Sequence, residues 1–319
     1  MVKLGIMIEG QEGLNWARWN RLIDDAERLG FDSLWRSDHL FSVMGESQRE
    51  TLALWPSLTA VAMQSSRIEF GQLVSPTTFR HPVHLALDGA AVDQASGGRF
   101  WLGVGAGWNE SEHAAFGFRL PPLKERMDRF EEALKVIKLL GTGQAATFAG
   151  EHFQLDNAWT TSTPTRASGA RLMIGGSGER RTLRLVAEYA DEWNATSMSL
   201  DAYAQKTDVL LRHCVAVGRD PGLIQRSMML GHVIGRDERE VQRRATELQA
   251  VNPGLRDLPV AEVLSRLRER GWLVGTPAEV VEQVQARGAQ GVERIMMQTF
   301  LMDDVEQLEL IASEVIPQV

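Results

Sequence analysis

An acid and an imidazole stand side by side at the end of a short apolar run near the N-terminus. Residues 31–36 form that run, and Ser37, Asp38 and His39 follow it. An imidazole titrates near neutrality, so a histidine placed beside a substrate can give or take a proton during a reaction. We therefore predict His39 as a general acid or base with Asp38 as its neighbour. The alternative is that Asp38 caps a turn and His39 is an ordinary loop residue.

Two glycine-containing segments follow later apolar runs. Residues 103–110 read Gly-Val-Gly-Ala-Gly-Trp-Asn-Glu, and their glycine spacing differs from the dinucleotide-binding fingerprint. The glycines nevertheless allow a flat ring or a phosphate to lie close to the backbone. Residues 174–178 read Ile-Gly-Gly-Ser-Gly and precede a helical stretch, a pattern typical of a phosphate cradle but not of an ATP loop. The alternatives are tight packing at Gly103 and a plain turn with Ser177 as the helix N-cap.

A third segment of interest begins at Ser75. Small polar residues lead there into Arg80 and His81, which bring positive charge. His81 and His84 together suggest a metal pair. However, no cysteine or third histidine lies near them in the sequence, and Pro82 interrupts a helical turn between them, so we predict no metal site.

The elements that position these segments alternate between strand and helix. Strands are predicted at residues 3–9, 31–36, 68–74, Phe100–Gly105, Arg171–Gly175, Glu192–Thr196, 227–234 and 292–299. Helices are predicted at residues 16–29, Leu54–Gln64, 83–94, 123–140, 180–189 and 277–287. Nearly continuous apolar strands separated by helices indicate a parallel sheet covered on both faces. Eight of them predict an α/β fold, a (β/α)₈ TIM barrel, with a doubly wound open sheet as the alternative.

Two long connections, residues 108–170 and 235–291, are predicted insertions at the C-terminal mouth of the barrel. The first contains a small hairpin around Gly150, and the second carries several charged helices. Catalytic groups of such barrels lie at the carboxyl ends of the strands, where His39 and both glycine segments fall. Because no repeat or linker is visible, we predict a single domain over residues 1–319.

Composition excludes several classes of protein. The 319 residues include 34 Lys and Arg against 42 Asp and Glu, a net charge of −8, which argues against nucleic-acid or membrane-surface binding. No run of 18 apolar residues could span a membrane. A lone cysteine, Cys214, indicates a reducing compartment, so we expect a cytoplasmic protein. The nine Trp hint at an apolar or aromatic small-molecule substrate, although core packing explains them equally well.

Taken together, the segments resemble the luciferase-like monooxygenase superfamily of flavin- and deazaflavin-dependent enzymes. The bacterial branch that uses coenzyme F420, an 8-hydroxy-5-deazaflavin, is the most similar. Residues 29–39, 79–82, 96–110, 174–183 and 189–194 carry the resemblance. These motifs span almost the whole chain in the right order, and they favour the fold more strongly than they favour any one substrate.

This resemblance implies a cofactor at the barrel mouth and a hydride transfer in which His39 donates or accepts the proton. It implies a non-proline cis peptide between Leu73 and Val74. Arg80, His81, Arg180 and Arg181 would meet a polyanionic cofactor tail. A homodimer is expected through Leu54–Gln64, with apolar residues Trp55, Leu58, Val61 and Ala62. The cofactor-binding residues implied are Asp38, Leu73, Val74, Ser75, Ala106, Gly107, Trp108, Gly175, Gly176 and Ser177.

The sequence also departs from relatives in this superfamily. Trp108 stands where the sugar-phosphate dehydrogenases of the branch have a glutamate, which argues against a sugar-phosphate substrate. No arginine stands near Ala106, where bacterial luciferase uses one to hold the FMN phosphate, and this favours the deazaflavin. Three hypotheses follow: an F420-dependent oxidoreductase acting on a small organic molecule, an FMN-dependent monooxygenase, and a flavin-binding protein without catalysis.

Overall fold

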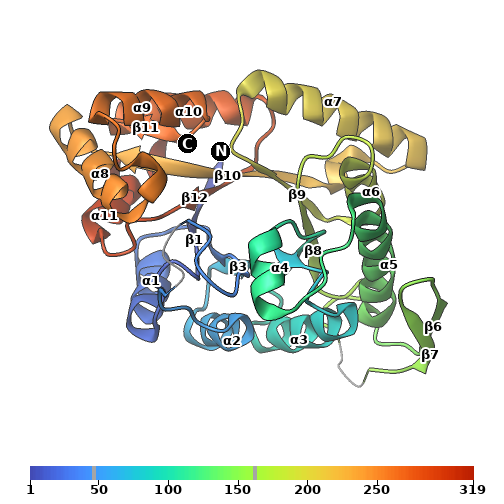
Figure 1. Cartoon of the computed structure of the whole chain (residues 1–319). Coiled ribbons are helices and arrows are strands. Elements are labelled where there is room, and N and C mark those ends of the chain that lie inside the picture. The colour runs from blue at the N-terminus through green and yellow to red at the C-terminus, as the bar shows by residue number, and fades with distance from the viewer. Residues whose placement is uncertain (45–47, 161–163) are drawn as a thin grey trace. The chain divides into compact units, whose positions relative to one another are not determined.

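Strands and helices alternate along the chain in the order of a (β/α)₈ TIM barrel, as predicted (Figure 1). The computed structural model describes residues 1–44, 48–160 and 164–319. Contacts divide them into two units, and the boundary falls within β9 (Glu192–Thr196) and within α7 (Leu200–Val217). Unit 1 comprises Met1–Leu52, Asn194–Val209 and Gln225–Val319, and unit 2 comprises Ala53–Trp193 and Leu210–Ile224. A single domain over the whole chain stays a prediction.

Unit 1 contains a parallel sheet in the order β11-β10-β12-β1-β2. Its strands are β1 (Lys3–Ile8), β2 (Ser33–Arg36), β10 (Gln225–Ile234), β11 (Leu273–Gly275) and β12 (Arg294–Gln298). Its helices are α1 (Trp16–Arg28), α8 (Glu238–Val251), α9 (Val260–Glu269), α10 (Pro277–Ala289) and α11 (Val305–Glu314), with short 3₁₀ turns at Pro253–Leu255 and Ile316–Gln318. In the register, Ile6 lies beside Leu34 and Leu4 beside Ile295, and these apolar side chains are buried.

Unit 2 contains a parallel sheet of β3, β5 and β8, with the short β4 also paired to β5. Its strands are β3 (Glu69–Gln72), β4 (Ser75–Pro76), β5 (Phe100–Gly105), β6 (Ala146–Ala149), β7 (Gln154–Ala158) and β8 (Arg171–Gly175). Its helices are α2 (Leu54–Gln64), α3 (Pro82–Ala95), α4 (Glu110–Phe116), α5 (Leu123–Gly141) and α6 (Thr182–Tyr189), with a 3₁₀ turn at Pro221–Leu223. The predicted hairpin is present as β6 and β7 and stands beside α5 (Figure 1).

Local sequence signals explain most helix ends. The Asn15 side chain accepts a hydrogen bond from the Arg18 backbone N–H at 3.0 Å and caps α1, and Gly30, with φ +82°, follows the other end. Pro82 opens α3, where its missing N–H costs nothing. Thr276 and Glu279 form a capping box on α10.

The structure corrects the sequence-based elements in three places. The strand predicted at residues 68–74 is interrupted: β3 ends at Gln72 and β4 begins at Ser75. Helix α6 begins at Thr182, two residues later than predicted, with Arg181 rather than Ser177 at its N-cap. The sequence analysis also missed β11, α4, α7 and α11, of which β11 and α4 have three and seven residues, too few for a clear periodic pattern.

No helix in the described part of the chain is long and apolar enough to span a membrane.

Candidate active site

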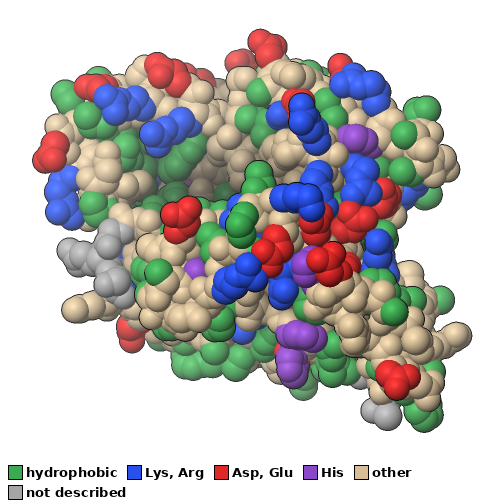
Figure 2. Space-filling view, turned by 45° about the vertical axis from the view of Figure 1, so that its right-hand side comes forward, with side chains coloured by type: hydrophobic (Ala, Val, Ile, Leu, Met, Phe, Trp, Pro, Cys, Tyr) green, Lys and Arg blue, Asp and Glu red, His purple; other side chains and the backbone are tan. Residues whose placement is uncertain are grey.

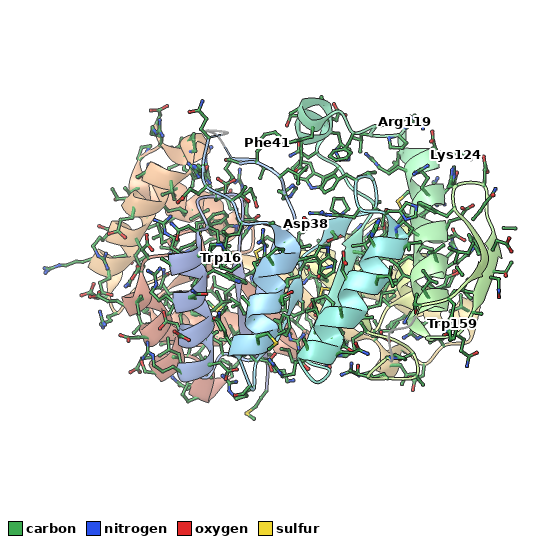
Figure 3. All side chains as sticks on the ribbon, turned by 90° about the horizontal axis from the view of Figure 1, so that it is seen from below. Trp16, Asp38, Phe41, Arg119, Lys124 and Trp159 are labelled. Atoms are coloured by element: carbon green, nitrogen blue, oxygen red, sulfur yellow. The ribbon has the colours of Figure 1, made fainter. Side chains whose placement is uncertain are left out.

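The segment after β2 is held by the end of β1, both in unit 1. The Ser37 backbone N–H donates to the Ile8 carbonyl at 3.0 Å, and the Gly10 N–H donates to Ser37 Oγ at 2.9 Å. Asp38 is buried and His39 is half-buried, and both follow the carboxyl end of β2 (Figure 3 labels Asp38). The structure thus places this predicted pair at a strand end inside unit 1, on a segment with fixed backbone.

A buried polar network in unit 1, which the sequence analysis missed, supports this segment. The Ser37 hydroxyl donates to Gln11 Oε1 at 2.6 Å. Gln11 Nε2 donates to Glu9 Oε2 at 2.8 Å, and Gln298 Nε2 donates to Glu9 Oε1 at 2.5 Å. Because the Glu9 carboxylate accepts from both amides, it fixes the way each amide faces. The only sequence signal was the presence of polar residues just beyond the ends of β1 and β12.

In unit 2, the Val74 side chain packs against glycines of two neighbouring strands. The peptide between Leu73 and Val74 is cis, as the family resemblance predicted. A Cβ on Gly105 would lie 2.7 Å from Val74 Cγ2, and a Cβ on Gly175 would lie 3.0 Å from Val74 Cγ1. At Gly103 a Cβ would meet the Gln72 carbonyl. These three glycines are therefore explained by tight packing, the alternative given above for Gly103.

The turn after β5 is also built in unit 2. Gly107 has φ +81°, and a Cβ there would meet Thr78 Oγ1. The Thr78 hydroxyl lies 2.7 Å from His113 Nε2, and His113 Nδ1 lies 2.6 Å from the Asn109 carbonyl. Since a carbonyl only accepts, Nδ1 carries the proton and Nε2 accepts from Thr78. His113, which the sequence analysis did not single out, thus fixes the turn of Ala106, Gly107 and Trp108.

The glycine loop after β8 is held by two side chains of unit 2. Trp193 Nε1 donates to the Gly176 carbonyl at 2.8 Å, and His213 Nε2 contacts the Glu179 carbonyl at 2.7 Å. Gly176 has φ +123°, a backbone conformation that favours glycine. The loop of Gly175, Gly176 and Ser177 is consequently rigid, with two of its carbonyls turned toward protein donors.

Unit 2 engages most of the cations predicted to meet a polyanionic tail. Arg181 lies 2.7 Å from Asp128, and the Arg80 guanidinium lies over the Phe79 ring at 5.6 Å. His81 caps α3, and burial lowers its pKa, with smaller contributions from His84 and Arg129. Arg181 is therefore committed to an internal ion pair, which corrects the role given to it above.

Two further predictions change in the light of burial. Leu58, Val61 and Ala62 of α2 are buried in the core and do not offer an exposed apolar face. Four of the nine tryptophans, Trp19, Trp35, Trp101 and Trp193, are core residues, while Trp108 beyond β5 is 64% exposed. Core packing therefore accounts for much of the tryptophan content. Within the described ranges, no three His, Cys, Asp or Glu side chains gather as a metal site requires.

Comparison with known proteins defines the family. The family model for luciferase-like monooxygenases matches residues 3–294, so the chain belongs to that family. It is 30% identical over 274 residues to an F420-dependent hydroxymycolic acid dehydrogenase of Mycobacterium tuberculosis, a match covering 82% of this chain and 73% of that protein. It is 26% identical to an F420-dependent glucose-6-phosphate dehydrogenase of Kineococcus radiotolerans, covering 92% of this chain and 90% of that protein.

Solved structures share the fold at lower identity. An F420-dependent secondary alcohol dehydrogenase, solved with an F420-acetone adduct, matches with a TM-score of 0.80 and 19% identity over 100% of this chain and 99% of that one. A monooxygenase from Streptomyces bottropensis matches with a TM-score of 0.82 and 19% identity over 99% of both chains. The TIM barrel of this family therefore serves dehydrogenases and monooxygenases.

Proposed function

We propose that the protein is an F420-dependent oxidoreductase that moves a hydride between the deazaflavin and a small organic substrate. The match to F420-dependent dehydrogenases over most of the chain carries this proposal. The absence of an arginine at Ala106 agrees with it.

The residues present fit a phosphorylated ring cofactor. In unit 2, Gly107 and Gly176 adopt backbone conformations that leave no Cβ in the way, and Thr78, His113 and Trp193 fix both turns. Backbone N–H groups of Ala106–Trp108 and of Gly175–Ser177 would hold the phosphate. The side of the ring would rest on the backbone of Leu73, Val74 and Ser75. Bound there, the deazaflavin would accept or donate a hydride at a ring carbon.

The residues of unit 1 would handle the proton. When a secondary alcohol loses a hydride, its oxygen must also lose a proton, and the reverse reaction must return one. His39 would exchange that proton at the substrate oxygen. Asp38, buried beside it on a segment fixed by Ser37, would contact the cofactor. A positioned acid or base of this kind typically contributes about 10²–10⁴-fold to the rate.

The proposed cofactor is tested by titrating the purified protein with F420 and with FMN, following ring fluorescence. F420 should bind more tightly than FMN. Tighter binding of FMN would favour the second candidate, an FMN-dependent monooxygenase, which the structural match to a monooxygenase supports. A flavin-binding protein without catalysis remains the third hypothesis, and no observation favours it.

The proposed role of His39 is tested by the substitution His39→Ala. Turnover of an alcohol or ketone found by screening with F420 should fall by at least about a hundredfold, while the dissociation constant for F420 changes only a few fold. His81→Ala is the matched control, because His81 caps α3 and is the other histidine next to a strand end. If His81→Ala abolishes turnover and His39→Ala does not, the catalytic assignment moves to the segment after β4.

A further inference from the structure

A cavity of about 420 Å³ lies within unit 2, beside the turn of Ala106, Gly107 and Trp108. Its walls come from α4, from the segment joining α4 to α5, and from the first turn of α5. The lining residues used below are Glu110, His113, Phe118, Pro121, Leu123 and Arg126. We call it the α4–α5 cavity.

One cation in this cavity lacks a partner. Arg126 Nε is buried without a hydrogen bond, and among the described residues the Arg126 side chain has no ion pair. A buried donor without an acceptor costs about 1–3 kcal/mol, more when it is charged. An anion entering the cavity would remove that cost.

Neighbouring cations are matched, which makes Arg126 different from them. Arg119 lies 2.7 Å from Glu125, and Lys124 lies 3.0 Å from Asp128. Arg119 and Lys124 flank the start of α5 (Figure 3). Figure 2 shows the surrounding face, where basic and acidic side chains are closely mixed. Arg126 is on the same helix but faces a space with apolar walls, where the low dielectric strengthens its attraction for a carboxylate.

The position of the cavity identifies the anion. Glu110 and His113 belong to α4, which begins two residues after Trp108, and three helical residues span only about 4.5 Å. The phosphate proposed for the adjacent turn continues, in F420, into lactyl and glutamyl groups that carry carboxylates. We propose that the α4–α5 cavity is a second anionic subsite, in which Arg126 binds a carboxylate of the F420 side chain beyond the phosphate. This inference rests on the proposed function.

The chain also contains a competitor for that carboxylate. Glu110 is exposed, lines the same cavity and forms no ion pair with Arg126. Its negative charge repels an entering carboxylate, so removing the charge should strengthen binding. Arg126 and Glu110 therefore give variants with opposite expected effects.

The test compares three probes by fluorescence titration: F420 with its glutamyl tail, F420 truncated after the lactyl group, and the deazaflavin riboside, which lacks phosphate and carboxylates. Arg126→Gln should weaken binding of both anionic forms about tenfold and leave riboside binding unchanged. Arg126→Lys should restore part of the loss. Glu110→Gln should tighten binding of the anionic forms only. Whether truncated F420 behaves like the full cofactor tells which carboxylate is bound.

Lys124→Gln is the matched control, because it removes one positive charge from the same helix at an exposed side chain paired with Asp128. It should change F420 affinity less than about twofold. Salt should weaken F420 binding more steeply in the wild type than in Arg126→Gln. Equal weakening of riboside and F420 by Arg126→Gln, or no weakening while the wild type binds F420, would overturn the subsite alone. A wild type that prefers FMN would instead overturn the proposed function.

Discussion

At the scale of single residues, Val74 explains glycines that the sequence analysis weighed as cofactor contacts. Gly105→Ala would bring a Cβ within 2.7 Å of Val74 Cγ2 and force that side chain to shift. We expect the free energy of unfolding to fall by about 1–3 kcal/mol, the usual cost of overpacking. Chemical denaturation measures it. Gly254→Ala is the control, since the nearest atom to its Cβ would lie 3.4 Å away. Equal stability of the two variants would contradict this explanation.

A second residue-scale prediction concerns His232, which is buried in unit 1. Its Nδ1 lies 3.2 Å from Gln307 Oε1, and its Nε2 lies 3.0 Å from Thr299 Oγ1. Burial lowers the pKa of His232 to about 4, despite opposing contributions from Gln307 and Asp304. The unfolded chain, with a histidine pKa of about 6.5, then binds a proton that the folded chain does not. The stability from this group is complete above pH 6.5 and is lost as the pH falls toward 4.

The expected loss from His232 is about 3 kcal/mol of unfolding free energy between pH 6.5 and 4. Denaturation measured across pH 6.5 to 5 should show a smaller slope for His232→Gln than for the wild type. His84→Gln, at an exposed histidine, should keep the wild-type slope. An unchanged slope in His232→Gln would show that other groups cause the pH dependence.

At the scale of elements, one carboxylate anchors the β6–β7 hairpin to α5. Glu132 accepts hydrogen bonds from the backbone N–H groups of Glu151, His152 and Phe153, at 2.8, 2.8 and 3.0 Å. Burial acts to raise the pKa of Glu132, but these bonds outweigh it and hold the pKa below its usual range. The folded state is thus stabilised above pH 4.3 and loses that stabilisation as the pH falls further.

We expect Glu132→Gln to loosen the hairpin, because an amide NH₂ cannot accept from the backbone N–H groups. The cost should be about 1–3 kcal/mol. Hydrogen exchange of the amides at residues 150–157 should speed up while the strands of unit 2 stay protected. Glu151→Gln removes a charge from the same turn and should leave exchange unchanged. Similar exchange in both variants would show that the charge, not the three bonds, matters.

At the scale of the whole molecule, the homodimer stays a prediction with a revised basis. The apolar residues of α2 are mostly buried, but Met63 on that helix is 71% exposed. If α2 pairs with a second copy, Met63→Asp should convert the dimer to a 35.5 kDa monomer, because a buried aspartate without a partner is costly. Val215→Asp, at an exposed residue of α7, should leave the dimer intact. Analytical ultracentrifugation measures both. A wild-type monomer at micromolar concentration would contradict the dimer itself.

The sequence by itself determined the strands, because nearly continuous apolar runs bounded by glycine and polar residues mark strands buried on both faces. Phe100–Gly105, Arg171–Gly175 and Glu192–Thr196 were predicted with their observed bounds. Strand order then put Asp38 and His39 at a carboxyl end. The cis peptide before Val74 came from the family resemblance and not from any local pattern.

Only the tertiary structure decided which polar side chains support these segments. Glu9, Gln11 and Gln298 each read as an ordinary polar residue beyond a strand, and they form one network because β12, β1 and β2 are neighbours. His113 reaches Thr78 across 35 residues of sequence. The burial of Arg126 without a partner likewise depends on how α4 and α5 pack. The physical reason is that hydrogen bonding and desolvation depend on neighbours in space, while periodicity reports only neighbours along the chain.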